Sequence, residues 1–250
     1  MDDEQQQRVV LVTGAGTGIG RATARAFADA GARVLAVGRR AAPLAETAAG
    51  HPLIAPVTAD VTDPDAPDRL VRTALDRFGR LDVLVNNAGV AGAGPLAELD
   101  EAAARRQLDT NLVAPIRLAH AAVGPLTAGG GVIVNVTTSV GQRGWPGSSV
   151  YAAGKAALDS LTRSWAVELA PRGVRVVAVA PGAIDTPIGE HQGLSPDQLA
   201  AVRHWQLDHT PLRRIGRPQD VAWAIVRLCD PAAAFVTGVV LPVDGGAVVA

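Results

Sequence analysis

Several features that assign proteins to special classes are scarce in this chain. It has one cysteine, Cys229, which excludes an intramolecular disulfide framework and a cysteine-based zinc site. Its 23 lysine and arginine residues balance 24 acidic residues, so the net charge of −1 gives no basic surface for nucleic acid or an anionic membrane. His191, His204 and His209 lie close together but lack the spacing of a metal site. We therefore expect no nucleic acid, no membrane and no metal as partners.

Long apolar runs are also missing. No stretch approaches the length that spans a bilayer, and residues 1–7 lack the basic and apolar parts of a signal peptide. We expect a soluble, cytoplasmic protein. Aromatic residues make up only 3% of the chain against 48% hydrophobic residues, so the core must consist of Ala, Val, Leu and Ile. No repeat or linker divides the chain, which predicts a single domain over residues 1–250.

Short β-branched runs alternate with longer helical stretches. Most of the runs are apolar without alternation, which is typical of strands buried on both faces of a parallel sheet. The predicted strands are residues 9–13, 33–37, 53–58, 83–86, 132–136, 174–179 and 239–243. This pattern predicts an α/β, doubly wound Rossmann fold with a parallel sheet of about seven strands and helices on both faces. Ligands of such folds bind at the carboxyl ends of the strands.

A glycine-rich loop follows the first predicted strand. It reads Thr13-Gly14-Ala15-Gly16-Thr17-Gly18-Ile19-Gly20. Glycine permits a tight strand-to-helix turn and close approach of a pyrophosphate, and the following helix offers free N–H groups to the negative charge. The spacing of Gly14, Gly18 and Gly20 differs from the common G-x-G-x-x-G fingerprint. Its position directly after the first strand still favours dinucleotide binding over a plain turn.

The residues at the end of the second predicted strand indicate which dinucleotide the chain binds. An acidic residue there would bind the ribose hydroxyls of NAD, but the chain has Gly38, followed by Arg39 and Arg40. Arginine can hold a 2′-phosphate through paired, charge-assisted hydrogen bonds. This favours NADPH/NADP+ over NADH/NAD+ as the cofactor. The alternative is that the two arginines only begin a solvated helix.

Tyr151 and Lys155 lie four residues apart at the start of a predicted helix, so they share one face. An isolated tyrosine, with a pKa of about 10, is a poor acid or base at neutral pH. A neighbouring ammonium favours the phenolate and would lower the pKa of Tyr151 into a useful range. The two residues are therefore a candidate proton donor and its activator.

From residue 13 to residue 246 the chain resembles the short-chain dehydrogenase/reductase family, in its compact branch of about 250 residues that includes 3-oxoacyl-thioester reductases and ketoreductases. Besides the motifs above, the resemblance rests on an acidic turn at 60–61, Asn-Asn-Ala-Gly at 86–89, Asn111, Pro-Gly at 181–182 and Val-Asp-Gly-Gly at 243–246. It implies cofactor contacts from Gly14, Thr17, Gly18, Ile19, Gly20, Gly38, Arg39, Arg40, Asp60, Val61, Asn87, Ala88, Gly89, Tyr151, Lys155, Pro181, Gly182, Ile184 and Thr186.

In this family a serine 13 residues before the tyrosine binds the substrate oxygen. The chain has Thr138 at that position, and Ser139 is its neighbour. Threonine supplies the same hydroxyl, although its methyl group narrows the site and restricts the rotamer. A one-residue slip of the loop would place Ser139 there instead, so both residues are candidates.

The resemblance implies hydride transfer between NADP(H) and a carbonyl or secondary alcohol, with a small-molecule ketone as the expected substrate. Tyr151 would deliver the proton, and Lys155 would lower its pKa and bind the nicotinamide ribose. Asn111 would hold a water in a proton relay. The alternatives are an NAD-dependent alcohol dehydrogenase of the same family, an epimerase or dehydratase, and a non-catalytic nucleotide sensor or scaffold.

A substrate lid is predicted over residues 188–210, with a short amphipathic helix whose apolar residues are Leu199, Val202 and Leu207. Trp145 and Trp205 lie in the candidate substrate loops. They indicate either an apolar, ring-shaped substrate or packing at a subunit interface. By the family resemblance, we expect a homotetramer.

Overall fold

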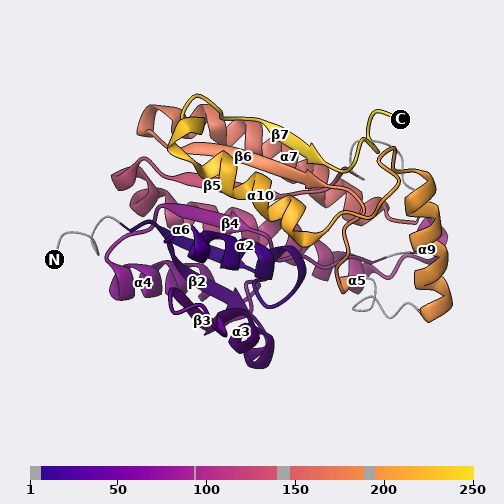
Figure 1. Cartoon of the computed structure of the whole chain (residues 1–250), viewed down its shortest axis with the longest axis horizontal. Coiled ribbons are helices and arrows are strands. Elements are labelled where there is room, and N and C mark those ends of the chain that lie inside the picture. The colour runs from indigo at the N-terminus through magenta and orange to yellow at the C-terminus, as the bar shows by residue number, and fades with distance from the viewer. Residues whose placement is uncertain (1–6, 93, 140–146, 189–194) are drawn as a thin grey trace.

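The computed structural model describes residues 7–92, 94–139, 147–188 and 195–250. Within these residues seven strands form one parallel sheet in the order β3-β2-β1-β4-β5-β6-β7 (Figure 1). The strands are β1 (Val9–Thr13), β2 (Arg33–Gly38), β3 (Ile54–Thr58), β4 (Val83–Asn86), β5 (Val132–Val136), β6 (Arg175–Pro181) and β7 (Val240–Val243). The predicted α/β fold class, with its doubly wound parallel sheet, is confirmed.

Helices connect successive strands, as parallel pairing requires. The α-helices of the described residues are α2 (Gly18–Asp29), α3 (Ala41–Ala48), α4 (Ala66–Phe78), α5 (Glu101–Leu108), α6 (Ala114–Gly129), α7 (Ser149–Leu169), α9 (Pro196–Asp208) and α10 (Pro218–Cys229). A π-helix, η2 (Asp109–Val113), joins α5 to α6. The 3-10 helices are η1 (Leu96–Glu98), η4 (Ala170–Arg172) and η5 (Pro231–Ala233).

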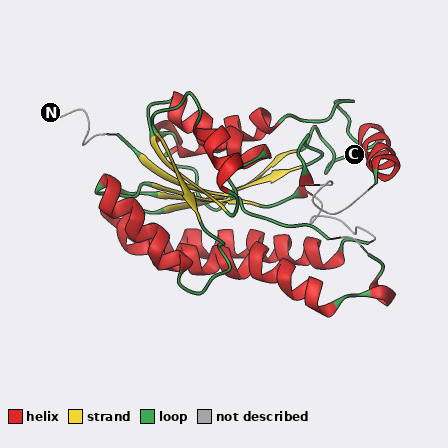
Figure 2. Cartoon of the chain, turned by 90° about the horizontal axis from the view of Figure 1, so that it is seen from below, coloured by secondary structure: helices red, strands yellow, loops and turns green. Residues whose placement is uncertain are grey.

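The apolar strands supply two cores, one on each face of the sheet (Figure 2). Successive strand residues point to opposite faces, so Val9 and Leu11 pack with α4, α6 and α7, while Val10 and Val12 pack with α2, α3 and α10. This explains why the strands read as continuous apolar runs. None of the helices in the described parts of the chain is long and apolar enough to cross a membrane.

The strand order reverses between β1 and β4. In an open parallel sheet this reversal opens a crevice at the carboxyl ends of the strands. Helix α9 lies beyond these strand ends, apart from the two layers of helices (Figure 1). It falls inside the predicted lid, but it has no buried residue, so the expected apolar stripe does not pack against the core.

Candidate active site

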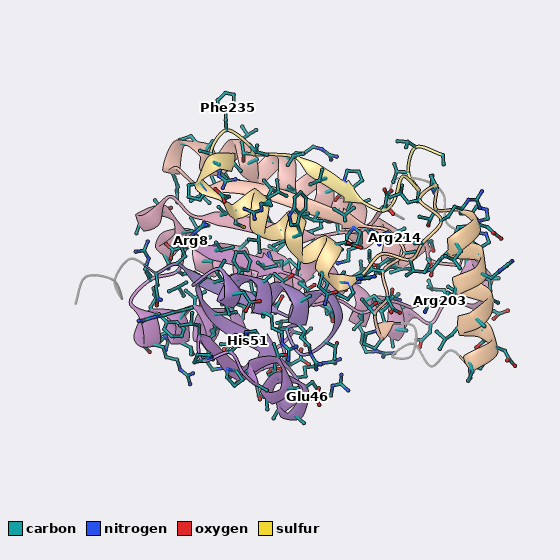
Figure 3. The ribbon with its side chains drawn as sticks, viewed as in Figure 1. Arg8, Glu46, His51, Arg203, Arg214 and Phe235 are labelled. Atoms are coloured by element: carbon teal, nitrogen blue, oxygen red, sulfur yellow. The ribbon has the colours of Figure 1, made fainter. Side chains whose placement is uncertain are left out.

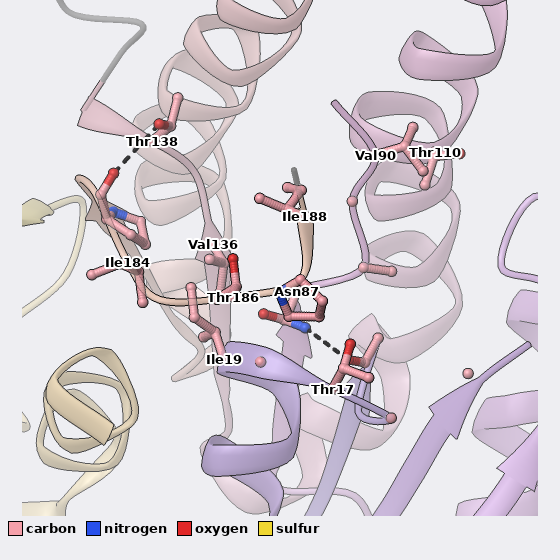
Figure 4. A pocket seen from close by; sticks show the side chains of 18 of the residues that line it. Thr17, Ile19, Asn87, Val90, Thr110, Val136, Thr138, Ile184, Thr186 and Ile188 are labelled. Carbon is pink, nitrogen blue, oxygen red and sulfur yellow. Dashed lines mark hydrogen bonds between the residues drawn. The ribbon is translucent and has the colours of Figure 1, made fainter. Parts of the chain in front are cut away.

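A cavity of about 310 Å³ lies at the carboxyl ends of the central strands (Figure 4). Most residues that the sequence singled out line it. These are Gly14, Thr17, Gly18, Ile19, Gly38, Arg39, Arg40, Asp60, Val61, Asn87, Ala88, Gly89, Thr138, Tyr151, Lys155, Pro181, Gly182, Ile184 and Thr186. Gly20, Asn111 and Ser139 are not part of the wall.

The glycine loop turns sharply at Gly14 and Gly18, where φ is +66° and +52°, in the left-handed region that favours glycine. A Cβ atom on Gly14 would lie 2.8 Å from Nδ2 of Asn87, and one on Gly18 would lie 3.1 Å from Cγ2 of Thr186. Gly20 supports the loop from behind, because a Cβ atom there would collide with the carbonyl oxygen of Gly14. The loop backbone therefore forms a cradle that larger residues would fill.

The cradle ends at the amino terminus of α2. Thr17 occupies the N-cap position, but its side chain makes no capping hydrogen bond. The first N–H groups of a helix have no partner within the helix and carry the positive end of its dipole. Since Thr17 and Gly18 both line the cavity, this helix end can receive an anionic group such as a pyrophosphate.

Thr13 and Asn87 tie the glycine loop to the end of β4. The Thr13 hydroxyl accepts hydrogen bonds from the backbone N–H groups of Asn87 and Ala88, each at 3.0 Å. In return, Nδ2 of Asn87 donates to the Thr13 carbonyl oxygen at 2.7 Å. Thr13 is buried, so these bonds are shielded from water and fix the width of the crevice.

Charged side chains gather at the ends of β2 and β3. Arg39 and Arg40 line the cavity together with Asp60. The Asp60 carboxylate accepts hydrogen bonds from the N–H of Thr62 at 3.0 Å and from its hydroxyl at 2.8 Å, which fix the turn. A Cβ atom on Gly38 would make an ordinary contact of 3.4 Å with Cδ2 of Leu44. This end of the cavity therefore carries two guanidinium groups and an engaged carboxylate.

Tyr151 lies in the first turn of α7 and lines the cavity. Burial raises the pKa of its phenol above the ordinary value of 10.0, and a hydrogen bond with Thr138 opposes the rise. The direction differs from the lowering by Lys155 that the sequence suggested, because desolvation of the phenolate is the larger effect. At neutral pH the phenol therefore carries its proton.

Thr138 and Ser139, the two candidate hydroxyls, differ in their surroundings. Thr138 lines the cavity, bonds to Tyr151 and donates to the Pro181 carbonyl oxygen at 3.4 Å (Figure 4). Ser139 is also buried, but it lies outside the cavity wall. Of the two candidate hydroxyl groups, that of Thr138 therefore belongs to a residue of the cavity wall.

Lys155 follows one helical turn after Tyr151, and these residues are the only lysine and the only tyrosine of the chain. The Lys155 ammonium donates to the Val136 carbonyl oxygen at 2.8 Å and is 4% exposed. Burial lowers its pKa from 10.5 to about 8, while the charge of Asp159 acts in the opposite direction. Its charge is therefore present at pH 7 but titrates just above.

Asn111 lies in the π-helix η2 and is buried. Its side chain accepts from the N–H of Val90 at 2.9 Å and donates to the Val90 carbonyl oxygen at 2.7 Å. A Cβ atom on Gly89 would lie 3.3 Å from Oδ1 of Asn111 and 3.6 Å from Nζ of Lys155. Asn111 and Lys155 therefore flank the same glycine, and the Asn111 amide fixes the loop after β4.

The sequence missed part of the cavity wall. No local pattern marks Thr110, whereas Ile188 and Gln206 fall within the lid predicted over residues 188–210 without being singled out there. Thr137 could have been found as the neighbour of Thr138. The other missed lining residues are Gly16, Pro43, Ala59, Val90, Val136 and Pro187.

Two tryptophans are candidate substrate contacts on the basis of the sequence, and the structure describes one of them. Trp145 lies outside the described residues. Trp205 is 39% exposed and stacks on His209 with ring centroids 4.0 Å apart, and it is not part of the cavity wall. The residue of α9 that reaches the cavity is Gln206.

Comparison with known proteins agrees with this arrangement. Residues 14–248 match a family model described as Enoyl-(Acyl carrier protein) reductase. The chain is 44% identical to cis-4-hydroxycyclohexanecarboxylate dehydrogenase of Sinomonas cyclohexanicum and 40% identical to L-xylulose reductase of Bos taurus, covering 98% of each chain in both cases. It is similar to the crystal structure of 3-ketoacyl-(acyl-carrier-protein) reductase from Brucella melitensis complexed with NADH, with a TM-score of 0.90, 32% identity and coverage of 97% of this chain and 98% of that chain.

The chain therefore belongs to the short-chain dehydrogenase/reductase family. The three relatives given above are, by name, a dehydrogenase and two reductases, and they support an enzymatic, oxidoreductase role for this chain.

Proposed function

We propose that this protein is an NADP(H)-dependent oxidoreductase that interconverts a ketone and a secondary alcohol, acting mainly as a ketone reductase. The observation that carries the proposal is the hydrogen bond between Tyr151 and Thr138, formed in a cavity that Lys155 and the glycine loop also line. This bond supports the proposal because it brings together two hydroxyl groups that could both reach one carbonyl oxygen. The names of two relatives, a dehydrogenase of a hydroxy acid and a reductase of a sugar, support exchange between an alcohol and a carbonyl.

The described residues fit a dinucleotide. The cradle at Gly14 and Gly18 leaves room for a pyrophosphate, and the uncapped start of α2 offers N–H donors to it. Arg39 and Arg40 would hold a 2′-phosphate, since guanidinium groups bind phosphate through paired hydrogen bonds. The absence of an acidic side chain at Gly38 favours NADP(H) over NAD(H).

At the reacting end, Tyr151 would donate its phenolic proton to the carbonyl oxygen, and Thr138 would donate a hydrogen bond to the same atom. The raised pKa of Tyr151 keeps that proton on the phenol until it is needed. Lys155 would stabilise the phenolate that remains and hold the nicotinamide ribose. When bound, the nicotinamide supplies or accepts the hydride.

Asn111 remains a proposed member of the proton relay. Because its side-chain amide is engaged with Val90, a relay water would bind its backbone. The π-helical conformation at this residue supports the idea, since a π-bulge changes which backbone groups are bonded and often marks a functional site.

The lid proposal now rests on two contacts. Ile188 and Gln206 line the cavity, and the Arg203 guanidinium lies 3.4 Å from the Asp185 carboxylate, which joins α9 to the segment after β6. Residues 189–194 of the proposed lid lie outside the described residues. We assign the substrate end of the cavity to this side.

The proposal includes a homotetramer built from the single domain of residues 1–250. Phe235, fully exposed, projects from the surface (Figure 3), and Trp223 is 63% exposed. Large exposed apolar side chains support burial between subunits. Light scattering after gel filtration should give four times the chain mass of 25.6 kDa, and a monomer would contradict the proposal.

Titration with NADPH and NADH, followed by nicotinamide fluorescence, tests the cofactor. We expect NADPH to bind more tightly. Arg39→Ala should weaken NADPH binding by about 10- to 100-fold, which is the contribution of one hydrogen bond to a charged group. It should leave the affinity for NADH unchanged. Gly38→Asp, whose new Cβ the structure accommodates, should shift the preference towards NADH.

Arg117→Ala is the matched control, because Arg117 is exposed on α6 and is not part of the cavity wall. Tighter NADH binding, or indifference to Arg39, would point to the NAD-dependent alcohol dehydrogenase. NADPH binding without turnover of any ketone in a substrate screen would favour the non-catalytic sensor. Product formation without net oxidation would favour the epimerase or dehydratase.

A further inference from the structure

Helix α7 carries a row of ionisable side chains at intervals of four residues. A spacing of four keeps helical side chains on one face. The row consists of Tyr151, Lys155, Asp159 and Arg163. Tyr151 and Lys155 line the cavity, Asp159 is 6% exposed, and Arg163 is exposed. The row therefore leads from the cavity through the protein to the surface.

The buried position of Asp159 lowers the stability of the fold. Its Oδ1 atom is buried and makes no hydrogen bond within the described residues, although the Thr137 hydroxyl donates a hydrogen bond to the carboxylate. A buried carboxylate that is only partly bonded costs stability, and an apolar residue of similar size would not. Such a group beside a cavity points to a role in the chemistry.

Thr137 links Asp159 to the reacting end of the cavity. It lies between Val136 and Thr138 in the chain. The Val136 carbonyl oxygen accepts a hydrogen bond from the Lys155 ammonium, and Thr138 is hydrogen bonded to Tyr151. Thr137 itself lines the cavity. The end of β5 therefore contacts all three ionisable side chains at the buried end of the row.

The charges around the row are few. Burial brings the pKa of Lys155 down to about 8, and the Asp159 carboxylate opposes this. Burial raises the pKa of Asp159, but Thr137, Arg163 and Lys155 all favour its ionised form. The groups that the described structure brings to Lys155 from other elements, the Val136 carbonyl and the backbone of Gly89, are neutral, and so is the Asn111 amide on the other side of Gly89. Asp159 is therefore the negative charge that acts on Lys155.

We infer that Asp159 is a positioning residue that acts through Lys155: its buried carboxylate keeps the ammonium charged beneath the cavity. Asp159 does not line the cavity, so it need not touch substrate or cofactor. The inference rests on the proposed function in taking Lys155 as part of the catalytic site. Its effect is to widen the pH range in which Lys155 can support Tyr151.

The sole lysine of the chain makes the test direct. Protein labelled with ε-13C-lysine gives one lysine signal, whose pH titration reports the protonation of Lys155. We expect a midpoint near pH 8 in the wild type. Asp159→Asn should lower it by about one unit, the size expected of one nearby charge in partly hydrated protein. Asp159→Glu should restore it.

Arg117→Gln is the matched control, because it removes an exposed arginine charge from another helix, α6, and it should leave the midpoint nearly unchanged. The alkaline limb of kcat/KM for ketone reduction should move to lower pH in Asp159→Asn by the same amount as the NMR midpoint. A merely structural Asp159 would lower Tm and leave both curves in place.

An unchanged midpoint in folded Asp159→Asn would overturn the inference. If that variant does not fold, the wild-type signal decides, because it should show a second, acidic step as Asp159 ionises, and a single step would overturn the inference. The titration needs no turnover. A shifted midpoint in a protein without ketone reduction would support the inference and contradict the proposed function, and the reverse result would do the opposite.

Discussion

The Lys155 ammonium is hydrogen bonded to the Val136 carbonyl oxygen, at 2.8 Å, where β5 ends beneath the cavity. This bond joins α7 to the sheet and satisfies a buried acceptor at the same time. The residue that is proposed to support proton transfer therefore also contributes to the packing of the fold. Stability and activity should respond together to changes at Lys155, and pH separates the two effects.

Replacing Lys155 with methionine should change how stability depends on pH. The native pKa of about 8 lies below the ordinary 10.5, so between these values the unfolded chain binds more protons and the wild type gains stability as pH rises. Relative to Lys155→Met, the gain should reach about 3 kcal/mol by pH 10.5. Urea unfolding of both proteins from pH 7 upwards measures it, and parallel curves would contradict the assigned burial.

Tyr151→Phe should lower kcat for ketone reduction by about 10²- to 10⁴-fold, because it removes the proton donor. NADPH affinity should change little, since the ring and its packing remain. Stopped-flow turnover and fluorescence titration measure the two quantities. A variant with nearly full activity would show that another group donates the proton.

The sole tyrosine also reports its own ionisation. Burial raises its pKa, so ultraviolet difference spectra of the free protein should show phenolate only above the ordinary value of 10.0. Tyr151→Phe, which contains no tyrosine, supplies the baseline. Phenolate at neutral pH would mean that the ammonium outweighs burial.

Substitutions at Thr138 and at Ser139 should differ sharply in their effect on ketone reduction. Thr138→Val removes the hydroxyl that meets Tyr151 and keeps the shape, so kcat/KM should fall by about 10- to 100-fold, as for a lost hydrogen bond to the reacting oxygen. Thr138→Ser should retain activity. Ser139→Ala should have little effect, because Ser139 is not part of the cavity wall. The opposite ranking in steady-state kinetics would restore Ser139 as the substrate-binding hydroxyl.

Gly14→Ala should abolish tight NADPH binding. At φ +66° the new Cβ is strained and lies 2.8 Å from Nδ2 of Asn87, and strain of this kind costs about 1–3 kcal/mol. Gly31→Ala is the control, because Gly31 also has positive φ, +83°, but nothing lies within 4 Å of its Cβ position. It should lose some stability and keep NADPH binding, as measured by thermal unfolding and fluorescence titration.

The strands were predictable because each is a short apolar run between turn residues, and the boundary that differs most is the end of β6. Strand β6 was predicted to end at residue 179 and continues to Pro181, which pairs in register with Val243. Proline has no N–H to donate, so local rules end a strand before it. The partner strand β7, more than fifty residues later in the chain, determines this end.

The site was predictable where a motif is contiguous at a strand end, as at Gly14 and Asn87. It was not predictable at Thr110, which no sequence motif marks and which the packing of η2 brings to the cavity. The direction of the Tyr151 pKa shift could not be read from the Tyr-x-x-x-Lys spacing, because it depends on burial by elements from elsewhere in the chain. Asp159 did carry a local signal, its spacing of four from Lys155.

The buried position of the only lysine also determines how the folded protein reacts with amine-directed reagents. All other cations among its 23 lysine and arginine residues are arginines, which stay protonated and do not act as amines. Lys155 is only 4% exposed, so active esters and reducing sugars should leave its side chain, and with it the cavity, unmodified. Reagents that couple through side-chain amines should therefore label the protein only after it unfolds.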